Sequence, residues 1–171
     1  MSSFKNIYLT GFMGSGKSRL GHILAQKLSR TFVDTDALVE KKAHFTVADI
    51  FEKQGEAYFR KLETETIAEL AQRTNLVVAL GGGAVLDEKN RVLLKQGLWV
   101  FIDPPFAALK ERIMRRTHRP LAKSVEQLDE LYKTRRPFYE MAPIHVIETG
   151  DPEDVCQEAL KKILEKMKAE E

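Results

Sequence analysis

The segment from Gly11 to Ser18 constrains the fold of this chain more than any other. Its sequence, GFMGSGKS, matches the pattern G-x-x-x-x-G-K-[ST] and lies between an apolar run, residues 7–10, and a segment whose leucines recur at helical spacing. Glycines let consecutive backbone N–H groups curl into a concave nest, and a following helix directs its positive end at the same point. A strand, a phosphate-binding loop and a helix in this order predict an α/β domain that binds a nucleoside triphosphate.

Two side chains of this loop have expected roles of their own. Lys17 would bring a cation to the β- and γ-phosphates, and the Ser18 hydroxyl is placed for Mg²⁺. The alternative is a Gly- and Ser-rich turn that matches the pattern by chance. The strand before the loop and the helix after it argue against that alternative.

Composition bounds the remaining possibilities. The 171 residues, 43% of them hydrophobic, leave room for one sizeable core, so we expect a single domain over residues 1–171. Basic and acidic residues nearly balance, 27 against 25, and form no basic tract, which argues against a nucleic-acid partner. A single cysteine, Cys156, excludes an internal disulfide and is expected in a helix core. Without a long apolar run or a leader pattern, we expect a soluble, cytoplasmic protein that binds no membrane.

Strand-like and helix-like segments alternate along the chain, which predicts a parallel sheet covered by helices on both faces. The expected strands are residues 7–10, 31–34, 76–80, 98–103 and 144–148. Beyond the helix that follows the phosphate loop, helices are expected at 47–54, 56–73, 87–96, 106–116, 124–135 and from 151 onward. Pro137 disfavours helical geometry at the residue before it, so the helix from Ser124 should end near Arg135 and Arg136 should turn away into solvent.

Asp34 and Asp36 follow the second expected strand and are the expected acidic residues of the site. Phosphoryl transfer needs a carboxylate for Mg²⁺, yet the apolar strand 76–80 runs into three glycines without one. Residues two apart in an extended chain face the same side, so both carboxylates can point into the crevice at the carboxyl ends of the strands. One would serve Mg²⁺ and the other a substrate hydroxyl. In the structural alternative, Asp36 is the N-cap of a helix.

Three consecutive glycines and several arginines suggest a site for an anionic group. Gly81–Gly83 removes every side chain at a strand end, so a ligand can approach the backbone N–H groups, whereas a tight turn needs only one glycine. Arginines supply planar donors for carboxylates and phosphates, although each one alone could be a solvated surface residue. The candidates are Arg60, Arg116, Arg119 and Arg135. The histidines show no ligand spacing, and we assign none of them to a metal.

These segments, taken in order, resemble the shikimate kinase family over nearly the whole chain. The likeness is carried by GFMGSGKS, Asp34-Thr35-Asp36, Phe59-Arg60 with Glu63, Gly81-Gly82-Gly83, Arg119-Pro120-Leu121 and Arg135-x-Pro137-x-Tyr139. The first motif occurs in many nucleotide-binding families, but six motifs in this order are specific. The resemblance implies a three-layer α/β/α P-loop fold with strand order 2-3-1-4-5, a substrate-binding region at residues 36–63 and a lid at residues 114–125. It also implies ATP-dependent phosphorylation of the 3-hydroxyl of shikimate, a step toward the aromatic amino acids.

The resemblance further implies roles for individual residues. The ATP phosphates would lie on the backbone of Gly14, Ser15, Gly16, Lys17 and Ser18. Mg²⁺ would be held by Ser18 and, through water, by Asp34. The expected catalytic residues are Lys17, Asp36, which would meet the attacking hydroxyl, and Arg119 of the lid. The shikimate carboxylate would bind Arg60, Arg135 and the backbone of Gly81, Gly82 and Gly83, supported by Glu63. The adenine would lie between Arg116 and Pro152, and Arg119 would also contact the nucleotide.

The residues leave two other functions open. One is a related kinase that acts on gluconate or a nucleoside monophosphate. The other is a regulatory protein that binds nucleotide without turnover. The paired carboxylates and the arginines suited to a carboxylate argue against both, and we expect a monomer whose partner is a small molecule.

Overall fold

The fold is built on one parallel sheet. The computed structural model describes residues 6–115 and 124–169. Its strands are β1 (Asn6–Thr10), β2 (Thr31–Asp34), β3 (Leu76–Ala79), β4 (Leu98–Asp103) and β5 (Ile144–Ile147). They pair in the order β2-β3-β1-β4-β5 and all adjacent pairs are parallel. The expected α/β fold and strand order are therefore confirmed, and each strand lies within one residue of its expected bounds.

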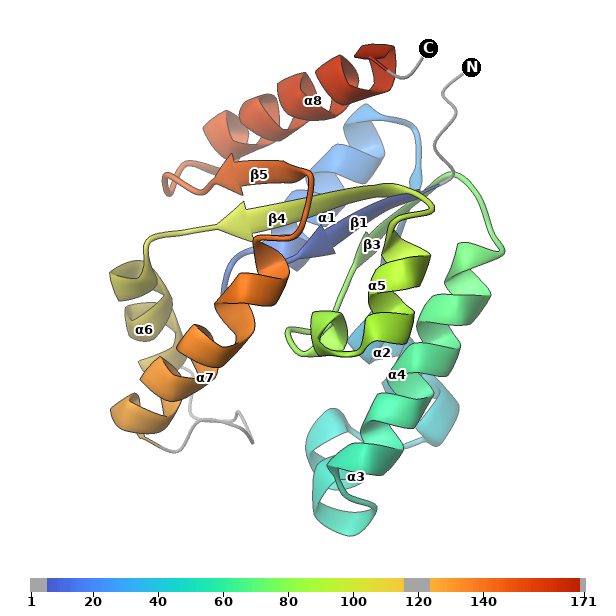
Figure 1. Cartoon of the computed structure of the whole chain (residues 1–171), viewed down its shortest axis with the longest axis vertical. Helices are drawn as coiled ribbons and strands as arrows, with labels where there is room; N and C mark the ends of the chain where they lie inside the picture. Colours follow the sequence, from blue (N-terminus) through green and yellow to red (C-terminus); the bar gives the residue numbers. More distant parts are fainter. Residues whose placement is uncertain (1–5, 116–123, 170–171) are drawn as a thin grey trace.

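Helices cover both faces of this sheet (Figure 1). They are α1 (Lys17–Lys27), α2 (Thr35–Ala43), α3 (Val47–Lys53), α4 (Glu56–Ala71), the 3-10 helix η1 (Ala84–Leu86), α5 (Glu88–Leu94), α6 (Phe106–Met114), α7 (Val125–Tyr139) and α8 (Pro152–Ala169). Apolar side chains of α1 and α8 pack on one face of the sheet. Those of α4, α5, α6 and α7 pack on the other, and this arrangement leaves the carboxyl ends of the strands free to form a site.

The helix α2 was not among the predicted helices. The structural alternative, in which Asp36 is the N-cap of a helix, is wrong about which residue caps it. The N-cap is Asp34, whose Oδ1 accepts hydrogen bonds from the N–H groups of Asp36 at 3.0 Å and Ala37 at 3.3 Å. Asp36 therefore lies in the first turn of the helix and not in an extended segment. Because Asp34 ends β2 and caps α2 at once, no linker separates the two elements, and the sequence shows no boundary between them.

The helix α7 also departs from expectation, because it continues through Arg136 and Pro137 to Tyr139. The N–H of Glu140 donates to the carbonyl of Arg136 at 3.1 Å, so the helical pattern resumes after the proline. Tertiary contacts override the local bias: the Tyr139 ring stacks on Phe101 with centroids 5.4 Å apart. Arg136 is not turned out into solvent, since its guanidinium pairs with the Asp103 carboxylate at 2.8 Å.

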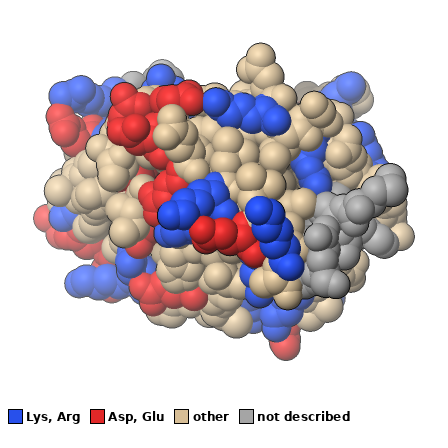
Figure 2. Space-filling view, turned by 90° about the horizontal axis from the view of Figure 1, so that it is seen from above, with Lys and Arg blue, Asp and Glu red and all other residues tan. Residues whose placement is uncertain are grey.

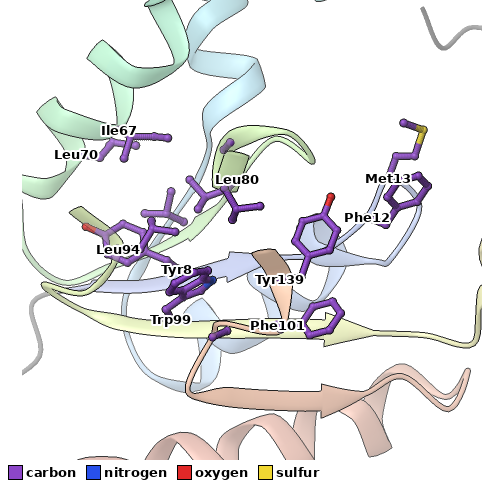
Figure 3. Packing of buried hydrophobic residues seen from close by; sticks show 14 of the residues in the cluster. Tyr8, Phe12, Met13, Ile67, Leu70, Leu80, Leu94, Trp99, Phe101 and Tyr139 are labelled. Atoms are coloured by element: carbon purple, nitrogen blue, oxygen red, sulfur yellow. The ribbon is translucent and has the colours of Figure 1, made fainter. Parts of the chain in front are cut away.

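The larger core lies between the sheet and helices α4 to α7 (Figure 3). Its largest side chain, Trp99, is buried, and its Nε1 donates to the Thr10 hydroxyl at 2.8 Å, so no polar atom of the ring is left unpaired. Figure 3 shows Phe12 and Met13 at the end of this core where β1 runs into the phosphate loop. The side chains of these two loop residues thus anchor the phosphate loop in the core.

Two further clusters complete the interior. The face covered by α1 and α8 includes Cys156, which is buried as expected for a helix-core residue. A smaller cluster of Val39, Ile50 and Phe59 joins α2, α3 and α4. This segment therefore has apolar packing of its own beside the main sheet.

On the face viewed in Figure 2, Lys and Arg side chains are spread widely, while Asp and Glu side chains lie mainly in the left half and the centre of the view. Among the described residues, no helix combines the length and the apolar character needed to cross a membrane.

Asn6 ties three elements together at the amino end of the sheet, and we predict that the fold depends on it. Its Nδ2 donates to the carbonyls of Leu70 and Arg73, both at 3.0 Å, and its Oδ1 accepts from the N–H of Leu76 at 3.1 Å. Replacing Asn6 by Ala leaves these groups unpaired and should lower the free energy of unfolding by about 2–3 kcal/mol, measured by urea denaturation.

Gln72 provides the control, because it is exposed and lies beside the same helix end. Its replacement by Ala should change the free energy of unfolding by less than about 0.5 kcal/mol. Equal effects at the two positions would contradict the assigned role of Asn6.

Candidate active site

Two adjoining cavities lie at the carboxyl ends of the strands. The larger, about 530 Å³, is lined by the phosphate loop, Asp34, Arg112, Glu148 and Pro152. The smaller, about 280 Å³, is lined mainly by α2, α3, α4 and the three glycines, with Arg135 of α7. Met13, Asp36, Gly81 and Gly82 line both cavities. Two ligands bound side by side would therefore meet at Asp36.

The phosphate loop has the backbone that an anion site requires. Gly14 and Gly16 have φ angles of 77° and 88°, which a residue with a side chain rarely adopts. Gly16 is also the N-cap of α1, and a glycine offers no side chain to pair the first N–H groups of the helix. Residues 16–19 line the larger cavity, where a phosphate could accept from the first N–H groups of the helix.

The Lys17 ammonium group lies over the same loop. Its Nζ donates to the carbonyls of Gly11 at 2.9 Å and Phe12 at 3.0 Å. The side chain therefore crosses back from the start of α1 to the end of β1, and its positive charge lies at the cavity wall. A cation fixed in this way can stabilise negative charge on a bound phosphate.

Ser18 and Asp34 form an oxygen pair at the mouth of the loop. The Ser18 hydroxyl donates to Asp34 Oδ2 at 2.8 Å, while Asp34 Oδ1 caps α2. A hydroxyl and one carboxylate oxygen suit Mg²⁺, which binds few protein ligands and keeps waters and phosphate oxygens. Within residues 6–115 and 124–169, no group of three or more His, Cys, Asp and Glu is arranged for a metal ion. The pair fits an ion that is completed by the nucleotide itself.

Thr35, which sequence reasoning missed, joins two of the segments that carry site residues. Its hydroxyl donates to the carbonyl of Ala79 at 3.3 Å and accepts from the N–H of Gly81 at 3.1 Å. The side chain is fully buried and joins the start of α2 to the end of β3. The sequence indicated Thr35 only by its position between two aspartates. That position alone could not show whether Thr35 merely separates them or has a structural role.

Asp36 and Glu63 direct unpaired carboxylate oxygens at the same point. Asp36 Oδ1 and Glu63 Oε1 are buried and have no hydrogen-bond partner among the described residues. A Cβ at Gly81 would lie 2.7 Å from the first and 2.6 Å from the second, so only glycine fits between them. Burial and the neighbouring Asp34 carboxylate raise the pKa of Asp36, and the positive charges of Lys17 and Arg60 offset only part of this increase. Burial likewise raises the pKa of Glu63, against the charge of Arg60.

Two arginines stand beside these carboxylates in the smaller cavity. Arg60 donates from Nη1 to Glu63 Oε2 at 2.7 Å and also pairs with Glu56 at 3.2 Å. Arg135 is only 3% exposed, and its buried Nε has no partner among the described residues. A buried cation with an unused donor next to an open cavity is suited to an anionic ligand.

Gly82 and Gly83 face these arginines at close range. A Cβ at Gly83 would lie 2.3 Å from Arg60 Nη2, and one at Gly82 would lie 3.3 Å from Arg135 Nη1. The Tyr139 hydroxyl donates to the carbonyl of Gly82, and Figure 3 shows this hydroxyl pointing to the loop after β3. Tyr139 therefore fixes the glycine loop from α7, the helix that also carries Arg135.

Arg112 is a second residue that sequence reasoning missed. Its Nη1 donates to the carbonyl of Gly14 at 3.2 Å and its Nη2 to Glu148 Oε2 at 2.7 Å. It lines the larger cavity together with Pro152. Helical phase could have found it, because Arg112 is three residues after the buried Leu109 and so lies beside the inward face of α6.

The remaining expected residues lie where the structure gives no description. Arg116, Arg119 and most of the expected lid at 114–125 fall outside the described residues. The other expected site residues all line one cavity or both. The functions assigned to them stay predictions.

Comparison with known proteins gives consistent results. The family model described as Shikimate kinase matches residues 13–168. The shikimate kinase of Sulfurihydrogenibium sp. (strain YO3AOP1) is 41% identical over 162 residues, which cover 93% of this chain and 98% of that protein. The solved structure of shikimate kinase from Acinetobacter baumannii in complex with shikimate is 39% identical, with a TM-score of 0.89 and 96% of each chain covered. A gluconokinase from Sinorhizobium meliloti 1021 shares the fold, at 20% identity and a TM-score of 0.63 over 99% of this chain and 97% of that one.

The crowding at Gly81 predicts a steric effect of substitution. Replacing Gly81 by Ala would place a methyl group within 2.7 Å of two buried carboxylate oxygens. We expect the free energy of unfolding to fall by about 1–3 kcal/mol, measured by chemical denaturation, because both side chains would have to move. Gly82→Ala is the matched control, since its nearest neighbour is 3.3 Å away. A loss at Gly82 as large as at Gly81 would contradict the carboxylate geometry.

Proposed function

This chain belongs to the shikimate kinase family, and on that premise we propose that it transfers the γ-phosphoryl group of ATP to the 3-hydroxyl of shikimate. The products are shikimate 3-phosphate and ADP, on the route to the aromatic amino acids. The observation that carries the proposal is the smaller cavity, where two arginines and a glycine backbone adjoin the Asp36 carboxylate next to the phosphate loop. This set of groups suits a small acceptor that has one carboxylate and several hydroxyls.

ATP is assigned to the larger cavity. Its phosphates would bind the backbone N–H groups of residues 14–18 at the positive end of α1, with the Lys17 ammonium group at the β- and γ-phosphates. The adenine would lie between Pro152 and an arginine guanidinium. The resemblance assigns that role to Arg116, and Arg112, which lines this cavity with Pro152 and is held by Glu148, would lie beside the nucleotide as well.

Mg²⁺ would be held at the same cavity by the Ser18 hydroxyl and, through a water, by Asp34. When bound, the ion neutralises charge on the β- and γ-phosphate oxygens. The protein's own contribution is to keep the two oxygens adjacent, since the cap of α2 fixes the Asp34 carboxylate and leaves its Oδ2 facing Ser18.

The acceptor would bind in the smaller cavity through its carboxylate. Arg60 and Arg135 would donate to the two carboxylate oxygens, and the N–H groups of Gly81–Gly83 would add further donors. Glu63 is the support for this arrangement, because it holds Arg60 at 2.7 Å from a fully buried position. The carboxylate end is thereby fixed at a distance from the phosphate loop.

Asp36 would orient the attacking hydroxyl. Asp36 lines both cavities, and its carboxylate can accept the hydrogen bond of that hydroxyl. In the reaction the hydroxyl oxygen forms a bond to the γ-phosphorus, the bond from the γ-phosphorus to the bridging oxygen of ADP breaks, and the hydroxyl proton is released to solvent. Lys17 would stabilise the charge left on the bridging oxygen.

An ADP-release assay with shikimate, gluconate and AMP, each tested with ATP and Mg²⁺, tests the proposal. We expect turnover with shikimate only. Turnover confined to gluconate or AMP would replace the proposed acceptor, and no turnover with any of the three would favour a regulatory nucleotide-binding protein.

Lys17 is predicted to be needed for turnover and not for folding. Lys17→Met removes a fixed cation from the phosphate site, and we expect kcat to fall by about 100-fold or more while the melting temperature changes little. Lys27→Met is the control, because Lys27 makes an exposed ion pair with Glu153 away from both cavities. Unchanged kcat in Lys17→Met would refute the assignment.

Arg135 is predicted to bind the acceptor carboxylate. The loss of a charge-paired hydrogen bond in a buried site costs about 2–4 kcal/mol, so Arg135→Ala should weaken shikimate binding by roughly 30-fold to several hundredfold. Calorimetric titration measures the effect, with Lys133→Ala as the control because Lys133 lies on the same helix in an exposed ion pair with Glu130. Similar affinities of the two variants would show that the carboxylate binds elsewhere.

A further inference from the structure

Arg136 makes the most fully paired guanidinium contact on α7, although it lies outside both cavities. Its Nη1 donates to Asp103 Oδ1 at 2.8 Å and its Nη2 to Asp103 Oδ2 at 2.9 Å, while its Nε lies 2.7 Å from Glu140 Oε1. Both side chains of the Asp103 pair are mainly buried, with 33% and 22% exposed. A two-bond pair of this kind fixes the orientation of the guanidinium as well as its distance.

The aromatic rings around Arg136 restrict it further. The guanidinium carbon lies 5.7 Å from the centroid of Phe101 and 5.6 Å from that of Tyr132. Tyr132 in turn stacks on Phe106 of α6, with centroids 4.0 Å apart. The side chain of Arg136 is therefore held between the end of β4 and its own helix.

The pair between Arg136 and Asp103 fixes the rotation of α7 about its axis next to Arg135. Consecutive residues of a helix are about 100° apart, so holding Arg136 against Asp103 sets the direction of the neighbouring Arg135. Asp103 is the last residue of β4, and the sheet gives it a fixed place. The direction set in this way leads Arg135 into the smaller cavity, where its Nη1 faces Gly82.

The proline in α7 increases the need for such a contact. Pro137 has no N–H, so the helix lacks one backbone hydrogen bond in the turn that contains Arg135 and Arg136. A helix weakened at this turn can change direction there more easily than elsewhere. The Arg136 pair with Asp103 and the Tyr139 contact with Gly82 lie on either side of the proline and hold this turn.

We propose that Arg136 is a positioning residue for the acceptor: its two-bond pair with Asp103 holds the Arg135 guanidinium at the place where the carboxylate of the acceptor binds. The proposal rests on the function proposed above. Arg136 does not touch the acceptor in this arrangement. Its effect reaches the ligand only through Arg135, and so only through the ligand's negative charge.

That dependence on charge gives a test that a general structural role would not satisfy. Shikimate and its methyl ester are titrated calorimetrically into the wild-type protein and into Arg136→Ala, Arg136→Lys, Asp103→Asn and Lys133→Ala. Arg136→Ala should bind shikimate about 10-fold more weakly and the uncharged ester less than about 2-fold more weakly. The KM for ATP should change less than about 2-fold, because the nucleotide cavity does not include Arg136.

The other variants separate the pair from the charge of Arg136. Arg136→Lys keeps the charge but cannot make two parallel bonds, so it should recover only part of the loss. Asp103→Asn should weaken shikimate selectively as well, and adding it to Arg136→Ala should cause no further loss. Lys133→Ala should match the wild type for both ligands. If Arg136→Ala does not fold, the melting curve shows it, and Asp103→Asn then carries the test.

Two results would overturn the proposal. Equal losses for shikimate and the ester would show that Arg136 only stabilises the fold, and unchanged shikimate binding in Arg136→Ala and Asp103→Asn would show that Arg135 needs no such support. Failure of the wild-type protein to bind or phosphorylate shikimate is a different outcome, because it rejects the proposed function before any variant is compared.

Discussion

The Asp34 carboxylate makes the contacts on which the rest of the site depends. One oxygen caps α2, and the other accepts a hydrogen bond from Ser18 in α1. The same residue ends β2 in register with Ala79 of β3. Two helices and two strands are thereby fixed relative to one another at the carboxyl edge of the sheet, and both cavities open at that edge. A single side chain thus serves the fold and the phosphate site together.

The acceptor cavity contains buried polar groups that lower the stability of the fold and that a ligand could pair. Glu63 is fully buried, and among the described residues only one of its two oxygens has a hydrogen-bond partner, the Arg60 guanidinium. Asp36 and Arg135 each have a buried polar atom that no described residue pairs. Unpaired buried groups of this kind destabilise a protein unless a ligand pairs them. Their concentration in one cavity of the described chain is therefore a stronger indication of ligand binding than the shape of the cavity.

Several features of the site follow from local rules, and others do not. The loop at residues 11–18 was predictable because glycines at positive φ and a lysine at the start of a helix leave few alternatives. Asp34 and Asp36 were expected to act as a pair, but through an extended segment, whereas a cap and a first helical turn direct them to the site. The end of α7 was predicted wrongly from Pro137, because packing of Tyr139 and pairing of Arg136 outweigh the preference of one residue.

The sequence by itself determined the α/β class, the phosphate loop and the identity of most residues around the site, since these depend on periodicity and on motifs a few residues long. Only the tertiary structure decided which residues face one another. It brought Arg112 beside the phosphate loop and joined Thr35 to the end of β3. It also directed Arg135 into the smaller cavity and Arg136 to Asp103. These contacts join residues up to 98 positions apart in the chain, and the crossover order of a parallel sheet brings them together where no local pattern records them.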